Sequence, residues 1–332
     1  MRVRFSLSAT LMAALSLAGC SGGGLAPASL PDQASLQPDA HGGPQAAKTG
    51  LLYVALPNNN EILIFPQNAK ASTPPSGYIS GSKAKLDEPV GVFVDSSGQL
   101  FVTCTITNAV NVYKAGAAGN KAPASQISGH KTQISKPIGV ALDSKGKIYV
   151  ASANTNEIEV FAAGAKGNVA PLYTLSGTAT LLDNPAGIAL NASDQLIVAD
   201  EGDNAVTVFA AGASGNTAPI ATISGPATGI DEPGGVAVDA AGDIYVTNYA
   251  ANSIVEFSPG SKNNATPIVS INGTNTQLDA PTGIAVNASG TIFVGNSLAN
   301  QVNTYLEGDD GNSPPAVSIT DGITHPYGVA LH

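Results

Sequence analysis

A tripeptide of the form Pro-x-Gly recurs along most of the chain at an almost constant interval. Its prolines are separated by 48 residues four times and by 45 residues once, and they are Pro89, Pro137, Pro185, Pro233, Pro281 and Pro326. A fixed period of about 20–50 residues is the signature of a repeat architecture, in which each unit buries its apolar face against its neighbours. This period constrains the fold more strongly than any local motif.

Each repeat unit contains four short apolar segments. In one unit they are residues 236–238, 244–246, 254–257 and 267–271. Each segment has the length of a strand and is rich in β-branched or aromatic residues. Units of four antiparallel strands at this period predict an all-β chain folded as a six-bladed β-propeller, with four antiparallel strands per blade.

The joints between these segments contain turn-forming residues. The first is Asp-x-x-Gly or a near variant, as at Asp239 and Gly242, in which Asp accepts backbone N–H bonds. The second always contains an Asn that is suited to a left-handed turn. We assign a structural role to these six residues, which are Asn60, Asn108, Asn156, Asn204, Asn252 and Asn300.

The two ends of the repeat region complement one another. Residues 326–332 supply a first strand and nothing else, whereas residues 51–88 supply the second, third and fourth strands only. We therefore expect the ring to close by pairing of the N- and C-terminal segments into one composite blade, which removes an exposed sheet edge. The other blades are expected at 89–136, 137–184, 185–232, 233–280 and 281–325.

The unit PGGVAVDAAGDIYVTNYAANSIVEF at 233–257, with a second copy at 137–161, resembles the NHL repeat. The resemblance covers residues 51–332 and implies a propeller, but this repeat serves binding scaffolds, lactonases and lyases alike. The extension GASGNTAPIATISG is similar to that of bacterial surface lipoproteins with no assigned activity.

Two six-bladed enzyme families are also similar to this pattern. The resemblance to gluconolactonase implies a divalent cation held on the axis by Asp or Asn at the middle position of Pro-x-Gly. Streptogramin lyases carry a Trp-containing second strand, and this chain has no Trp. The middle positions hold no such oxygen ligands, because they are Val90, Ile138, Ala186, Gly234, Thr282 and Tyr327.

The N-terminus has the features of an export signal. Two arginines precede an apolar run too short to span a bilayer permanently. The run ends in Leu-Ala-Gly-Cys, which resembles the lipobox of bacterial lipoproteins. The sequence predicts a signal peptide at 1–19, lipidation of Cys20 and a flexible tether over 20–50. Ser21 favours the outer membrane, so we expect an exported chain that is lipid-anchored in the bacterial envelope.

Charge and cysteine content narrow the possible partners. Removal of residues 1–19 takes both arginines from the 14 basic residues and leaves 12 lysines against 24 acidic residues. This balance argues against nucleic acid as a partner. Cys104 is the only other cysteine, and at the end of a second strand it is expected to be buried and structural.

Carboxylates gather in the loops that follow the second and fourth strands, which emerge on one face of a propeller. Three residues at the same repeat position, Asp200, Asn248 and Asn296, supply oxygen ligands for a Ca²⁺ ion or a sugar. The alternative is that they cap their own hairpins. The full set of candidate ligand-binding residues is Asp200, Asp203, Asp231, Glu232, Asn248, Asn296, His325 and Tyr327.

No motif for a nucleophile with its base, a phosphate-binding loop or a zinc site occurs in the sequence. We therefore predict a monomeric, membrane-anchored, non-enzymatic binding module with no required cofactor. Its partner would be a small ligand, a saccharide or an envelope protein, bound at the acidic loops. The alternative is a metal-assisted hydrolase or lyase with an atypical site.

Overall fold

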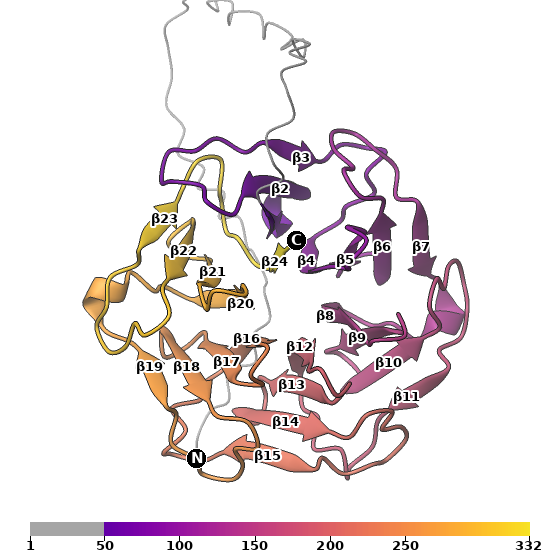
Figure 1. Ribbon diagram of the computed structural model, residues 1–332. Coiled ribbons are helices and arrows are strands. Elements are labelled where there is room, and N and C mark those ends of the chain that lie inside the picture. The colour runs from indigo at the N-terminus through magenta and orange to yellow at the C-terminus, as the bar shows by residue number, and fades with distance from the viewer. Residues whose placement is uncertain (1–49) are drawn as a thin grey trace, which may run out of the picture. The chain divides into compact units, whose positions relative to one another are not determined.

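The computed structural model describes residues 50–332, which form a ring of six four-stranded antiparallel sheets (Figure 1). The prediction of an all-β, six-bladed propeller is confirmed. We number the blades in chain order from the composite sheet β24-β1-β2-β3, which is blade 1, to the sheet of β20–β23, which is blade 6. The predicted signal peptide, Cys20 and most of the tether lie outside the described residues.

The innermost strand of every blade but one begins at a Pro-x-Gly proline. These strands are β4 (Pro89–Val94), β8 (Pro137–Leu142), β12 (Pro185–Leu190), β16 (Pro233–Val238), β20 (Pro281–Val286) and β24 (Val329–Leu331). The second strands are β1 (Leu51–Leu56), β5 (Leu100–Cys104), β9 (Ile148–Ser152), β13 (Leu196–Asp200), β17 (Ile244–Asn248) and β21 (Ile292–Asn296).

The two outer strands of each blade differ in length. The third strands are β2 (Glu61–Pro66), β6 (Ala109–Tyr113), β10 (Glu157–Phe161), β14 (Ala205–Phe209), β18 (Ser253–Phe257) and β22 (Gln301–Tyr305). The fourth strands are shorter and lie on the perimeter: β3 (Gly77–Ile79), β7 (Ser125–Ser128), β11 (Tyr173–Leu175), β15 (Ala221–Ser224), β19 (Val269–Ile271) and β23 (Val317–Ile319).

Helix is almost absent from residues 50–332. Three single-turn 3₁₀ helices occur there: η1 (Pro57–Asn59), η2 (His130–Thr132) and η3 (Thr274–Thr276). No helix in this part of the chain has the length and apolar character needed to cross a membrane.

The blades converge on the axis so closely that a side chain cannot fit at the Pro-x-Gly glycine. A Cβ atom on Gly283 would lie 2.5 Å from the carbonyl oxygen of Tyr327 in the next blade. Because real Cβ atoms do not approach backbone this closely, only glycine allows the blades to pack here.

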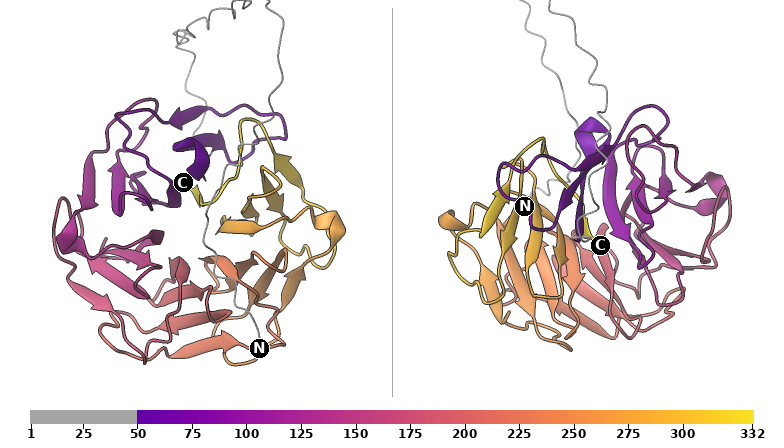
Figure 2. Two further views of the ribbon diagram at one scale, coloured as in Figure 1. Left: turned by 180° about the vertical axis from the view of Figure 1, so that it is seen from behind. Right: turned by 45° about the horizontal axis from the view of Figure 1, so that its top comes forward.

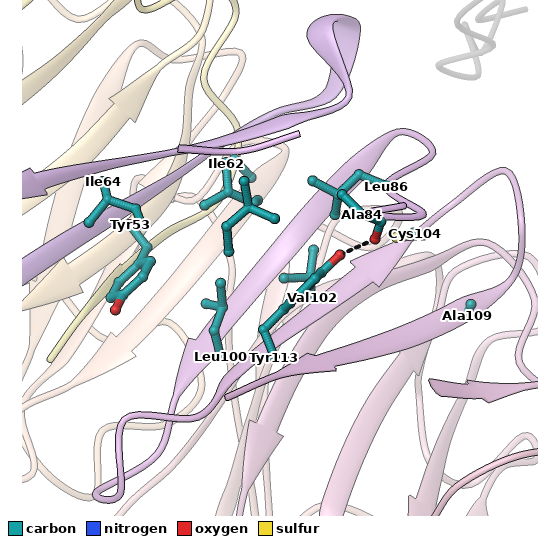
Figure 3. Packing of buried hydrophobic residues seen from close by; sticks show 12 residues of the cluster. Tyr53, Ile62, Ile64, Ala84, Leu86, Leu100, Val102, Cys104, Ala109 and Tyr113 are labelled. Carbon is teal, nitrogen blue, oxygen red and sulfur yellow. Dashed lines mark hydrogen bonds between the residues drawn. The ribbon is translucent and has the colours of Figure 1, made fainter. Parts of the chain in front are cut away.

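Apolar side chains fill the seams between neighbouring blades. Between blades 1 and 2, Tyr53 and Ile62 pack with Val102 and Tyr113, all of them buried (Figure 3). The Tyr113 hydroxyl donates a hydrogen bond to the carbonyl oxygen of Ala84, so the one polar atom of this side chain is satisfied. Each blade is therefore buried on both sheet faces, as the strand pattern requires.

The ends of the repeat region pair as the sequence predicts. In β24 and β1, Leu331 lies opposite Leu52 and Val329 lies opposite Val54. The backbones of Leu51 and His332 exchange two hydrogen bonds of 2.9 Å each. The ring therefore closes through one composite sheet, which Figure 2 shows from behind.

A loop of the following blade covers the outer edge of each of five blades. Between blades 3 and 4, the N–H of Gly215 donates to the carbonyl oxygen of Thr174 at 2.7 Å, and Ser176 donates back to Gly215 at 3.0 Å. The next residue, Asn216, accepts a hydrogen bond from the N–H of Ala179 at 2.7 Å. These contacts satisfy backbone groups that an edge strand would otherwise expose.

Candidate functional site

The loops that follow the second and fourth strands form one face of the ring, which we call the acidic face. On this face the six turn asparagines have positive φ, as predicted. Each also accepts a hydrogen bond of 2.6–2.8 Å from the backbone N–H of the residue just before the next Pro-x-Gly proline. The asparagines therefore join each blade to the next, a role that the turn chemistry alone did not reveal.

The residues whose backbone N–H groups donate these bonds form a circle around the axis, one from each blade. We call them the axial rim: Glu88, Lys136, Asn184, Glu232, Ala280 and His325. All six have positive φ, between 43° and 53° inclusive. A left-handed conformation is costly for residues other than Gly and Asn, so the surrounding hydrogen bonds hold this backbone in place.

Tyr327 projects into this rim from blade 1. Burial raises the pKa of its hydroxyl, and the nearby Glu201, Tyr249 and Glu88 raise that pKa further. Glu201 belongs to blade 4, which lies opposite blade 1 in a ring of six. The Tyr327 side chain therefore lies across the axis, among residues from blades 2, 4 and 5.

Two of these neighbours are fastened to the rim by backbone hydrogen bonds. The N–H of Glu201 donates to the carbonyl oxygen of Asn184 at 3.4 Å, and the N–H of Tyr249 donates to that of Glu232 at 3.0 Å. Burial raises the pKa of the Glu201 carboxyl; Lys136 lowers it and Glu232 raises it. Charges of both signs thus meet at one end of the axis.

Beneath the rim, an apolar cavity of about 80 Å³ lies on the axis. Its lining comes from all six inner strands, and Tyr327 is the one lining residue with a polar side-chain atom. The channel itself offers no ligand set for a metal ion, so the chemistry of this region lies in the rim and not in the channel.

The three residues predicted to supply oxygen ligands are Asp200, Asn248 and Asn296. They end the second strands of blades 4, 5 and 6, and all three are fully buried. Asn248 Oδ1 accepts a hydrogen bond from the N–H of Asp231 at 3.1 Å, and Asn296 Oδ1 accepts one from Asp279 at 2.6 Å. Each side chain thus holds the loop that leads into its own blade.

Asp200 follows the same pattern with a carboxyl group. Its Oδ2 accepts a hydrogen bond from Thr207 Oγ1 at 2.6 Å, whereas its buried Oδ1 has no partner among residues 50–332. Burial raises its pKa well above the usual value for Asp. This environment favours a neutral carboxyl group inside the blade.

The other predicted site residues lie nearer to solvent. Asp203, Asp231 and His325 are exposed, while Glu232 and Tyr327 are partly buried. Two of the eight, Glu232 and His325, belong to the axial rim. Across residues 50–332, no three His, Cys, Asp or Glu side chains are arranged to hold a metal ion.

Cys104 is fully buried, as predicted. Burial raises the pKa of its thiol to about 11, which keeps it protonated near neutral pH. Its sulfur lies 3.4 Å from Asn111 Nδ2 inside blade 2. This cysteine therefore has the environment of an inert structural residue.

Four residues of this region were not among the predicted site residues: Glu88, Lys136, Glu201 and Tyr249. Lys136 holds the position before a Pro-x-Gly proline, and Tyr249 follows a second strand, as Glu201 does. The 48-residue frame marks both positions, so aligning the six repeats by that proline could have found them.

Residues 182–209, within blade 4 and the loop before it, match the family model of the NHL repeat. No curated protein sequence matches the chain significantly. The chain is thus a six-bladed β-propeller, one segment of which matches the NHL repeat.

Solved structures with the same fold have little sequence similarity to the chain. A protein of unknown function from Bacteroides caccae is 12% identical, with a TM-score of 0.63, over 86% of this chain and 99% of that chain. A chain from a nidogen/laminin complex is 15% identical, with a TM-score of 0.60, over 85% and 98%. Catalytically inactive virginiamycin B lyase from Staphylococcus aureus with quinupristin is 15% identical, with a TM-score of 0.52, over 80% of each chain. At these identities the likeness shows the fold alone.

Proposed function

We propose that the chain is an exported, lipid-anchored, non-enzymatic propeller of a bacterial envelope that binds a saccharide at the axial rim. The observation that carries the proposal is the position of Tyr327, which lines the axial recess and lies near Glu88, Glu201 and Tyr249. Groups from several blades thus meet at one point of the acidic face, where a ligand could contact all of them.

The chemistry of the rim favours a polyhydroxylated ligand over a simple cation. Carboxylates of Glu88, Glu201 and Glu232 accept hydrogen bonds from hydroxyl groups, while Lys136 donates to them. Lys136 also disfavours a bound cation, because its own positive charge is close enough to lower the pKa of the Glu201 carboxyl. Tyrosine side chains add apolar area together with a polar tip, which suits the mixed surface of a sugar ring.

Export and anchoring rest on the N-terminal sequence. The apolar run that ends in Leu-Ala-Gly-Cys supports cleavage before Cys20 and acylation of its thiol. More than one acyl chain gives stable attachment to a membrane, whereas a single chain gives only marginal binding. The proposed site would then act at the membrane to which the anchor holds the chain.

Calorimetric titration of the full chain with a panel of envelope saccharides tests this function. A ligand at about one hundred times its dissociation constant should raise the free energy of unfolding by about 2.7 kcal/mol. Glu201→Gln and Tyr327→Phe should each weaken binding at least about tenfold. Glu307→Gln, an exposed carboxylate in a loop of the opposite face, is the matched control and should leave binding unchanged.

Four results would contradict the proposal. One is the lack of saturable binding by every saccharide, and another is equal affinity of the Glu201→Gln variant and the Glu307→Gln control. Turnover of a lactone or of a streptogramin by the chain would make it an enzyme. Stabilisation by Ca²⁺ alone, lost in Glu201→Gln, would instead assign a cation to the rim.

A further inference from the structure

A groove on the face opposite the acidic face is a recess that the proposed function leaves without a role. It lies at the seam between blades 4 and 5, which are neighbours in the ring (Figure 1), and has a volume of about 400 Å³. Ligand pockets in proteins commonly measure about 300–1,000 Å³. The aliphatic part of its lining comes from the side chains of Ile197, Val208 and Val238. The polar edge of the groove comes from Gln195, Ser261 and Lys262.

The preceding seam shows why this groove is open. In blade 4, Ile197, Val208 and Ala221 are neighbours across three strands. The same positions of blade 3 hold Tyr149, Val160 and Tyr173. Two tyrosines that fill the seam between blades 3 and 4 are thus replaced by Ile and Ala in the next blade.

The contacts of Tyr173 define what fits such a space. Its hydroxyl lies 3.2 Å from that of Tyr149, and Lys147 Nζ lies 5.5 Å from the centroid of its ring. The seam therefore accepts an aromatic ring beside a cation, an arrangement that the electron-rich face of the ring stabilises. The chain itself provides the pattern for an occupant of the open groove.

The mouth of the groove is also less obstructed than that of the preceding seam. There Ser144 donates through its backbone N–H and its hydroxyl to Asp194, at 2.8 Å and 2.6 Å, and so bridges the two blades. The corresponding residues beside the groove are Ala192 and Gly242, which carry no polar side-chain atoms. A ligand would enter without breaking such a bridge.

The charged side chains at the edge of the groove indicate an anionic ligand. The single ion pair within residues 50–332 joins Lys147 to Asp143, so Lys262 has no carboxylate partner there. The carboxylate of Asp239 is occupied, since its Oδ1 accepts the N–H groups of Ala241, Gly242 and Asp243 at 2.9 Å each. Asp239 keeps its negative charge, but among the residues that line the groove Lys262 is the one charged side chain without an ion-pair or hydrogen-bond partner within residues 50–332.

We propose that the groove between blades 4 and 5 is a second binding site, which takes a small aromatic carboxylate. The ring would occupy the space left by Ala221, against Ile197 and Val208, and the carboxylate would pair with Lys262. The exposed side chain of Ile220 at the outer end, of which 54% is accessible, would cover one edge of the ring.

Ligand-observed saturation-transfer NMR and titration of the full chain with hydroxyphenylacetate test this site. Ala221→Tyr, which restores the residue of blade 3, should abolish binding, and Ala221→Leu should weaken it without the larger ring. Ser125→Tyr places the same residue at the same position of blade 2 and should leave binding unchanged. Lys262→Gln should weaken binding about fivefold for the acid but not for the neutral hydroxyphenylethanol.

Four results would overturn the proposal. They are no saturable binding of hydroxyphenylacetate, unchanged binding in both Ala221 variants, equal loss in Ser125→Tyr, and equal affinity for the non-aromatic cyclohexylacetate. Glu201 lies beside the axial rim on the acidic face, so Glu201→Gln should not affect binding in the groove. The experiments therefore test the groove and the axial rim independently of one another.

Discussion

Replacement of Glu159 by Gln should remove a large part of the pH dependence of stability near neutral pH. Glu159 lies on β10 and is fully buried. Its Oε2 accepts a hydrogen bond from Ser152 Oγ at 2.7 Å, and its Oε1 has no partner among residues 50–332. Burial raises the pKa of this carboxyl to about 8, although the hydrogen bond from Ser152 acts to lower that pKa.

The sign and the size of the effect follow from that pKa. Between the ordinary pKa of 4.5 and about 8, the unfolded chain has released this proton while the folded chain retains it. The free energy of unfolding therefore falls as the pH rises through this interval, and the contribution of Glu159 is constant above it. At about 1.36 kcal/mol per pKa unit, the total loss is at most about 5 kcal/mol.

A neutral amide should tolerate this position, because Asn111 and Asn303 hold it in blades 2 and 6 and are also buried. Asp200 has a raised pKa as well, so it adds a loss of the same sign. Glu159→Gln should flatten the pH profile in part, and Glu159→Gln combined with Asp200→Asn should flatten it further.

Urea unfolding at about pH 5, 6.5 and 8 measures these profiles, with Glu307→Gln as an exposed control. Wild-type stability that is constant or rises over this range would refute the reasoning. So would a Glu159→Gln variant whose profile keeps the wild-type slope, because the buried carboxyl would then not be its source.

Three further predictions concern the anchor and the ring. Cys20→Ala should abolish incorporation of a radiolabelled fatty acid, and persistent labelling would show that the anchor lies elsewhere. Deletion of 326–332 removes buried Val329 and Ala330 together with the backbone hydrogen bonds to Leu51 and Ala55. It should therefore lower the free energy of unfolding by at least about 5 kcal/mol. An unchanged melting temperature would contradict closure of the ring through β24. Gly283→Ala should lower the free energy of unfolding, measured by calorimetry, since its Cβ would lie 2.5 Å from the Tyr327 carbonyl oxygen. The same change at Gly77 is the control for loss of a glycine, because φ is not positive there and a Cβ atom would meet nothing closer than 3.6 Å.

The repeat period was sufficient to predict the architecture, because each physical requirement of a blade recurs in every unit. Asp239 illustrates this at the hairpins, where its Oδ1 accepts the three backbone N–H bonds that the turn motif predicts. The composite blade was predictable for the same reason: one end of the chain lacks the strand that the other end supplies. The inner strand is shorter than expected, since only residues 329–331 are extended, although Tyr327 and Gly328 still bond to Ala55.

The arrangement of the candidate site could not be predicted in the same way. Chemical type alone placed Asp200, Asn248 and Asn296 at a common site, yet their repeat position directs them into the blades, where backbone groups require partners. Conversely, Glu201 lies near enough to Tyr327 to raise the pKa of its hydroxyl, and this proximity depends on closure between blades that are far apart in sequence. The sequence period shows which residues are equivalent, but not which of them point towards the axis.

Calorimetric titration of the saccharide that binds most tightly, compared between Tyr327→Phe and Asp200→Asn, tests the central claim most directly. The axial rim predicts that Tyr327→Phe weakens binding at least about tenfold, whereas Asp200→Asn keeps the wild-type affinity because that side chain is buried within blade 4. Loss of affinity in Asp200→Asn, with full affinity in Tyr327→Phe, would contradict the account and place the ligand at the ends of the second strands.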